Sequence, residues 1–168
     1  MGDHKDLQNH EGIEKLKKIA MDVDICMFCT NVSGIPFDTR PMSTQDVDDQ
    51  GNLWFMSKKG SNKDQEIKQD DRVQLLYADK KSSDYMTVNG HADVFYDRQK
   101  VGELWKPHAK AWFTEGKDDP EISIIRVRPE EAYYWDTRHG GMVAFFKMMV
   151  SAAVGKTMDD SVEGSIKP

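Results

Sequence analysis

A loop rich in serine and lysine around Gly60 gathers the residue types that bind a phosphate group. It reads Ser57-Lys58-Lys59-Gly60-Ser61-Asn62-Lys63 and directly follows the apolar run Leu-Trp-Phe-Met at 53–56. Hydroxyls, ammonium groups and the free backbone N–H groups of a following helix can all face one anion. The loop lacks the second glycine and the terminal Lys-Ser/Thr of a P-loop. The sequence therefore indicates either a different kind of phosphate site or an ordinary capped turn between a strand and a helix.

Arg40 is the second candidate for anion binding. It falls in a strand predicted from Pro36 to Val47, and residues 48–52 form the turn before the next strand, 53–57. Strands joined by a tight turn usually pair with each other. We therefore expect the Arg40 guanidinium to reach the same site as the loop, with a surface arginine at a strand edge as the alternative.

The composition limits the class of protein. A length of 168 residues favours one domain, 1–168, with a full core. The formal net charge of −6 argues against a nucleic-acid partner, because neutralising a phosphate backbone needs a basic face. No run approaches the roughly 18 apolar residues of a membrane span, and the N-terminus lacks a signal-peptide pattern. We expect a cytoplasmic protein with no membrane partner.

The only two cysteines, Cys26 and Cys29, form a C-x-x-C pair. This spacing occurs in redox and zinc sites. Here the pair lies within an apolar strand-like run, where residues three apart point to opposite faces. Zinc would need two more ligands, and no second cysteine pair exists. We predict two buried strand cysteines and no metal site.

Hydrophobic periodicity predicts about seven strands with short helices between them. An amphipathic helix is expected within residues 9–21, because apolar residues recur there at helical spacing. Strands are expected at 24–32, 36–47, 53–57, 71–79, 85–96, 121–128 and 131–135. Most connections are too short for parallel crossovers. The sequence therefore predicts a mainly β (α+β) fold, a small antiparallel barrel with peripheral helices.

Glycine, proline and serine positions refine this prediction. Asn89-Gly90 predicts a bulge or bend in a long strand. Ser61 is expected to cap a helix that ends near Asp70, and Pro107 to break the helical pattern of residues 98–113. The C-terminal part is predicted as a helix at 141–154 and a polar tail at 155–168.

Several motifs between residues 12 and 138 are characteristic in combination. They are Arg40-Pro41-Met42, Trp54-Phe55-Met56-Ser57 with Ser61-Asn62-Lys63, Trp105, the run 111–120 (AWFTEGKDDP) and the run 127–136 (VRPEEAYYWD). With these motifs the chain resembles the general stress protein branch of the pyridoxamine 5'-phosphate oxidase-like split-barrel superfamily. The resemblance implies a six-stranded antiparallel split β-barrel that forms a homodimer. It also implies a flavin, FMN or alternatively FAD, bound at the subunit interface.

The resemblance also implies roles for individual residues. Arg40 would contact the flavin and its phosphate, Met42 and Ser43 would lie along the isoalloxazine edge, and Trp135 would approach from the partner subunit. The phosphate loop maps onto Ser57, Lys58, Ser61, Asn62 and Lys63. Asn62 stands where the oxidase itself commonly has an arginine, which implies weaker phosphate binding.

Pyridoxamine phosphate oxidation is not expected, because the C-terminal substrate motif of the oxidase is reduced to Arg138-His139-Gly140. Two hypotheses about function remain. One is an FMN-dependent oxidoreductase acting on an unidentified small molecule. The other is a non-enzymatic flavin sensor or carrier, or a dimeric scaffold with a decayed cofactor groove. No acid–base pair stands out, so no catalytic residue is assigned. A third hypothesis, haem binding as in related split barrels, lacks a convincing histidine ligand.

Overall fold

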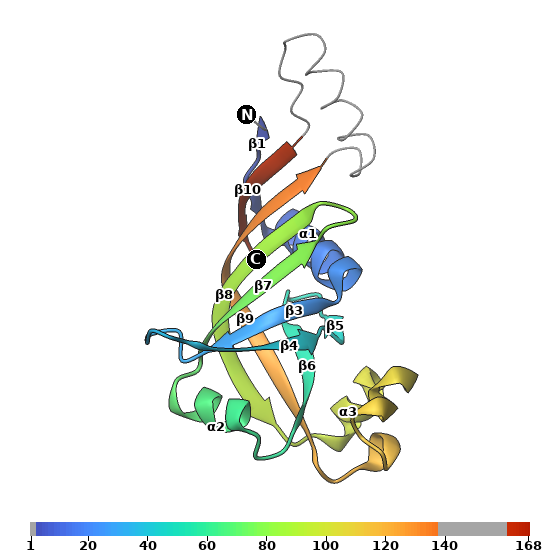
Figure 1. The fold of residues 1–168 in the computed structure, drawn as a ribbon. Helices are drawn as coiled ribbons and strands as arrows, with labels where there is room; N and C mark the ends of the chain where they lie inside the picture. The colour runs from blue at the N-terminus through green and yellow to red at the C-terminus, as the bar shows by residue number, and fades with distance from the viewer. Residues whose placement is uncertain (1–2, 138–160) are drawn as a thin grey trace.

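Ten strands form one continuous twisted sheet in the computed structural model, which describes residues 3–137 and 161–168 (Figure 1). Six of these strands pair only antiparallel among themselves, in the order β4-β3-β7-β8-β9-β6. They are β3 (Ile25–Thr30), β4 (Asp38–Ser43), β6 (Leu53–Lys58), β7 (Arg72–Asp79), β8 (Asp84–Phe95) and β9 (Ile122–Thr137). The sheet curls until β4 and β6 contact each other without pairing. This open barrel confirms the predicted fold class.

The long strand β9 divides the sheet. One edge pairs with β8, while the other pairs first with β6 and then, from Ala132 on, with β10 (Ser161–Lys167). Pairing with β6 ends at Val127 and pairing with β10 begins at Ala132. Pro129 lies between these two residues and has no N–H to donate. The predicted break into two strands at Pro129 is wrong, because pairing with β8 continues past it. The bulge is confirmed as a register shift between Asn89 and Gly90.

The C-terminal segment 161–167 is a strand, so the prediction of a polar tail is wrong there. β10 pairs antiparallel with β9 and parallel with the short strands β1 (Asp3–His4) and β2 (Leu7–Gln8). Ile166 is fully buried, which explains why a largely polar segment docks on the sheet. The predicted helix at 141–154 lies outside the described residues.

The helices lie at two ends of the sheet. α1 (Asn9–Val23) buries Leu16 and Ile19 and confirms the amphipathic helix. At the end opposite β1 and β10 lie α2 (Asn62–Gln69) and α3 (Arg98–Leu104), with the 3-10 turns η1 (Pro107–Ala111) and η2 (Gly116–Asp118) after α3 (Figure 1). No helix in the described ranges 3–137 and 161–168 is long and apolar enough to cross a membrane.

The strand that carries Arg40 does not pair with β6, contrary to the prediction. β4 pairs with β3, and Arg40 lies opposite Phe28. Only the two-residue strand β5 (Asp46–Val47) forms the expected pair with β6. The chain turns between β4 and β5, where Thr44 is buried and donates its backbone N–H to the Asp24 carbonyl. The hairpin at 48–52 is therefore real but shorter than predicted.

The cysteines of β3 are free and buried, which confirms their predicted structural role. Burial raises the pKa of the Cys26 thiol to about 12. The thiolate is the nucleophile and the metal ligand, so burial of Cys26 works against both roles.

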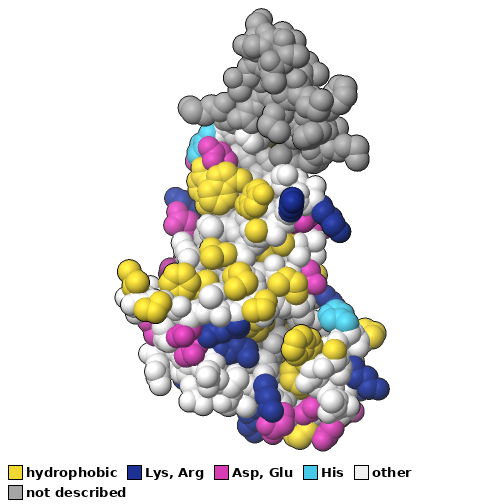
Figure 2. Space-filling view, viewed as in Figure 1, with side chains coloured by type: hydrophobic (Ala, Val, Ile, Leu, Met, Phe, Trp, Pro, Cys, Tyr) yellow, Lys and Arg dark blue, Asp and Glu magenta, His cyan; other side chains and the backbone are white. Residues whose placement is uncertain are grey.

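The outer face of the sheet carries mostly apolar side chains in registered rows. Met27, Leu76, Thr87 and Tyr133 face one another across β3, β7, β8 and β9. In the next row, Tyr85 lies opposite Trp135. Met27, Tyr85 and Trp135 are each about 40% exposed, and Figure 2 shows hydrophobic groups spread over one face of the molecule. Several large apolar side chains exposed on one sheet face are typical of an interaction surface.

Candidate functional site

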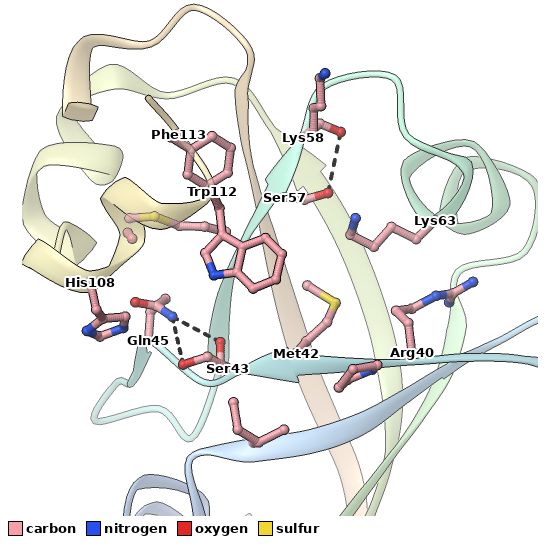
Figure 3. Close-up of a pocket in the computed structure, with 14 residues that line it drawn as sticks. Arg40, Met42, Ser43, Gln45, Ser57, Lys58, Lys63, His108, Trp112 and Phe113 are labelled. Carbon is pink, nitrogen blue, oxygen red and sulfur yellow. Dashed lines mark hydrogen bonds between the residues drawn. The ribbon is translucent and has the colours of Figure 1, made fainter. Parts of the chain in front are cut away.

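A cavity of about 380 Å³ opens between β4, β6 and the segment that contains η1 (Figure 3). This volume lies within the range of small-molecule sites. Its lining is Ile25, Arg40, Pro41, Met42, Ser43, Gln45, Met56, Ser57, Lys58, Lys63, His108, Ala109, Trp112 and Phe113. The cavity therefore lies where the curled sheet leaves β4 and β6 unpaired with each other.

A small second core fixes the wall that carries Trp112. Val101 and Leu104 of α3 pack with Phe113, Ile122 and Ile124. Phe113 is 8% exposed, whereas the preceding Trp112 is 83% exposed and also lines the cavity. Anchoring of Phe113 therefore leaves the neighbouring indole at the mouth, near the centre of the lining residues in Figure 3.

The cationic side of the cavity holds Lys63 and Arg40, which lie together in Figure 3. Lys63 Nζ donates to Ser61 Oγ at 3.3 Å. Burial lowers the pKa of Lys63 below its usual value, and the nearby Arg40 lowers it further, while Asp64 and Glu66 oppose the change. The exposed Lys58 adds a third cation. This side is suited to an anion.

The hydroxyls of the loop converge on a buried carboxylate. Asp64 is fully buried and accepts from Ser57 at 2.6 Å, from Ser61 at 3.1 Å and from Ser123 at 2.8 Å. Because a carboxylate only accepts, the protons of these hydroxyls point at Asp64. Ser57 and Ser61 would have to turn before they could donate to a phosphate, and in this arrangement Ser61 accepts from Lys63.

Ser61 occupies the N-cap position of α2, as predicted, but its side chain makes no capping hydrogen bond. The expected cap is wrong because the hydroxyl donates to Asp64 instead. The Ser61 backbone N–H donates to the Lys58 carbonyl, which closes the turn. This network joins the end of β6 to the start of α2 and holds the cationic loop in place.

Arg40 lines the cavity, and hydrogen bonds to Thr30 and Glu66 fix its guanidinium. Its Nη1 donates to Thr30 Oγ1 at 2.6 Å, and its Nη2 donates to Glu66 Oε2 at 2.8 Å. The Thr30 hydroxyl donates to the same Glu66 oxygen at 2.6 Å. The guanidinium therefore reaches the site from the β3–β4 pair, with a carboxylate of α2 already bound to it.

The rest of the cavity lining is mostly apolar with a polar edge. Met42 is 8% exposed, and Met56 also lines the cavity. Gln45 Nε2 donates to the Ser43 carbonyl and hydroxyl, both at 3.1 Å, and His108 lies on the same side in Figure 3. Gln45 Oε1 is buried without a hydrogen-bond partner in the described part of the chain.

Most residues expected from the sequence meet at this cavity. Those that line it are Arg40, Met42, Ser43, Ser57, Lys58 and Lys63. Ser61 supports them through Ser57 and Lys63, at 3.2 and 3.3 Å. Asn62 is exposed at the start of α2 and is not among the lining residues. Trp135 lies on the outer face of β9, away from this lining, so its approach from a partner subunit remains a prediction.

Sequence reasoning missed the wall formed by Gln45, Met56, His108, Trp112 and Phe113. Two indications were available. Gln45 closes the run that begins at Arg40, and Trp112-Phe113 lies in one of the most characteristic motifs. Neither position shows from the sequence alone that it faces the loop at 57–63, because the distant segments meet only in the folded sheet.

Comparison with known proteins agrees with this architecture. The chain is 30% identical over 90 residues to protein bli-3 of Neurospora crassa, a match covering 49% of this chain but only 43% of that protein. A protein from Jannaschia sp. CCS1 named for general stress protein 26 superposes with a TM-score of 0.75 at 22% identity, covering 92% of this chain and 97% of that chain. A general stress FMN/FAD binding protein from Xanthomonas citri gives a TM-score of 0.64 at 24% identity, covering 74% and 87%.

The family model described as pyridoxamine 5'-phosphate oxidase like matches residues 11–159 of the 168. This range includes the whole cavity lining and all six barrel strands. The chain therefore belongs to the pyridoxamine 5'-phosphate oxidase-like family.

Proposed function

We propose that this chain is a flavin-binding protein of the general stress type that holds FMN in the cavity between β4, β6 and η1. The observation that carries the proposal is the mixed lining, in which Lys63 and Arg40 lie at one end, Trp112 and Phe113 lie at the other, and Met42 lies between them. FMN has the same division, a planar ring joined to one phosphate. Family membership and the name of the Xanthomonas citri protein support this ligand class. We favour FMN over FAD because one cationic side suits one phosphate group.

The residues present fit such a ligand. Lys58 and Lys63 supply ammonium groups for the phosphate, and the N-terminus of α2 lies beside them. Met42, Met56 and Trp112 offer polarisable and aromatic surfaces for the ring. The flavin, when bound, supplies the redox chemistry. The protein binds the ring, orients it and limits its contact with water.

Direct chemical identification of a bound flavin tests this proposal. Freshly purified protein is denatured, and the released small molecules are separated and identified by mass. We expect FMN, released in proportion to the protein. A colourless protein that also fails to take up added FMN would contradict the proposal.

The finer activity we propose is flavin-dependent oxidation or reduction of a small molecule. The competing hypothesis, a sensor, carrier or scaffold without turnover, is favoured by one contact: Glu66 already occupies the Arg40 guanidinium. Steady-state consumption of reduced nicotinamide with a simple electron acceptor separates the two hypotheses. Turnover above that of free FMN identifies an enzyme, whereas bound flavin without turnover identifies a binding protein.

We further propose that the chain forms a homodimer through the outer face of β3, β7, β8 and β9, with Trp135 near the flavin of the partner subunit. The registered apolar rows and the exposure of Met27, Tyr85 and Trp135 support this face. Light scattering should give twice the chain mass of 19.2 kDa. Met27→Glu should lower that mass, because a charge would be buried in the contact. A wild-type protein at the mass of one chain would contradict the dimer.

A further inference from the structure

Arg40 belongs to a closed triangle of polar contacts at the cavity wall. Its corners come from β4 (Arg40), β3 (Thr30) and α2 (Glu66). Glu66 Oε2 accepts from Arg40 Nη2 at 2.8 Å and from the Thr30 hydroxyl at 2.6 Å, while Arg40 Nη1 donates to Thr30 at 2.6 Å. Thr30 is fully buried, and the Arg40 and Glu66 side chains are 24% and 17% exposed. The triangle is therefore partly shielded from water.

The cations around the cavity differ in whether they have a carboxylate partner. Glu66 forms an ion pair with Arg40, which offsets the positive charge of the guanidinium. No such carboxylate lies within 4.0 Å of Lys58 or Lys63 in residues 3–137 and 161–168, and the one hydrogen bond that Lys63 Nζ makes there is to a neutral hydroxyl. Asp64 accepts hydrogen bonds from three hydroxyls beneath the loop and forms no ion pair with Lys63. An incoming anion therefore meets two ammonium groups without a direct ion-pair partner among those residues, and one arginine that is already paired.

We infer that Glu66 is a specificity-determining residue, which competes with a ligand phosphate for Arg40 and so limits the affinity for phosphate-bearing flavins. A phosphate monoester carries a charge of about −1.5 to −2 at neutral pH. It must either displace Glu66 from Arg40 or bind Lys58 and Lys63 with a like charge nearby, and both weaken binding. The flavin ring is neutral, so neutralising Glu66 should not change how tightly the ring binds. The inference rests on the proposed function.

The test compares a flavin with a phosphate and a flavin without one. FMN and riboflavin are titrated calorimetrically into the wild-type protein and the Glu66→Gln variant, which keeps the shape and removes the charge. We expect Glu66→Gln to tighten FMN binding about twofold to fivefold, the scale of a partly exposed ion pair, and to leave riboflavin binding unchanged. Glu14→Gln on α1 is the matched control, because it removes one charge from an exposed position outside the cavity lining.

A second comparison asks whether the effect passes through Arg40. The FMN affinity lost on Arg40→Gln is measured in the wild-type protein and in the Glu66→Gln variant. If Glu66 competes for Arg40, losing Arg40 costs more FMN affinity after Glu66 is neutralised. Equal costs in the two backgrounds would overturn the competition. Glu66→Ala gives a second variant with the same expected direction, and thermal melts verify that each variant is folded.

The outcomes separate this inference from the proposed function. If wild-type protein binds neither flavin, the proposed function and the inference both fail. If FMN binds but Glu66→Gln leaves its affinity unchanged or weakens it, Glu66 does not compete for Arg40 and this inference alone fails. Equal tightening of FMN and riboflavin would overturn it as well, because the phosphate would then not be the group that Glu66 opposes.

Discussion

Lys63→Gln should weaken the binding of FMN and spare the binding of riboflavin. Lys63 lies at the start of α2, half-buried, with its ammonium group directed to the edge of the cavity. Its described hydrogen-bond partner is the Ser61 hydroxyl, which in turn donates to Asp64. The substitution keeps a long polar side chain and removes only the charge, so the loop should stay in place.

The size of the effect follows from the environment of the ammonium group. A hydrogen bond to a charged group contributes about 1.5–3 kcal/mol. Each 1.4 kcal/mol is a factor of about ten in affinity, so we expect a loss of about 10- to 100-fold for FMN. Burial and Arg40 lower the pKa of Lys63 from its ordinary value of 10.5. The charge, and with it the FMN preference, should therefore be lost on the alkaline side at a lower pH than for an exposed lysine.

Calorimetric titration of FMN and riboflavin into both proteins measures this difference. Lys80→Gln is the matched control, since Lys80 is exposed in the turn between β7 and β8 and does not line the cavity. An equal loss for FMN and riboflavin would refute the reasoning, because it would show damage to the ring site. No loss for FMN would refute it as well, because Lys63 would then not hold the phosphate.

Two further predictions concern stability. Gly90→Ala should destabilise the fold by on the order of 3 kcal/mol, because an added Cβ would lie 2.2 Å from the Arg128 carbonyl oxygen. The control is Gly102→Ala in α3, which has open space for a Cβ and should be neutral or stabilising. Denaturant unfolding compares the two variants, and equal unfolding midpoints would contradict the close packing at Gly90. Burial, and then the hydrogen bond with Asp136, raises the pKa of Asp84 to about 6 from 3.8. A raised carboxyl pKa stabilises the fold below the unfolded value and loses that contribution as the pH rises through the folded value. Melting temperatures should therefore fall between about pH 4 and pH 7, and Asp84→Asn should flatten this part of the profile; an unchanged profile in the variant would contradict the assignment.

Local sequence patterns were sufficient for most of the elements. The amphipathic helix α1, the strands β3, β6, β7 and β8 and the bulge at Asn89-Gly90 follow from periodicity and from glycine. The loop from Ser57 to Lys63 was found from its residue types, because a cluster of hydroxyls and ammonium groups is visible within one short segment. Features that depend on neighbouring residues were therefore predictable.

Features that depend on distant residues were not predictable in the same way. The partner of β6 along its length is β9, which begins more than sixty residues later at Ile122, so the expected pairing with the Arg40 strand was wrong. Glu66 was not selected, because its contact with Arg40 exists only once α2 packs against β3 and β4. Ile166 shows why β10 was missed: a single buried side chain in a polar segment has no periodicity to detect.

Titration of the wild-type protein with FMN, with riboflavin as the comparison, tests the central claim most directly. We predict one FMN per chain, quenching or other change of the flavin fluorescence, and tighter binding of FMN than of riboflavin, because Lys58 and Lys63 line the cavity and would attract the phosphate. An FMN fluorescence that stays unchanged, or an affinity for FMN no higher than for riboflavin, would contradict it.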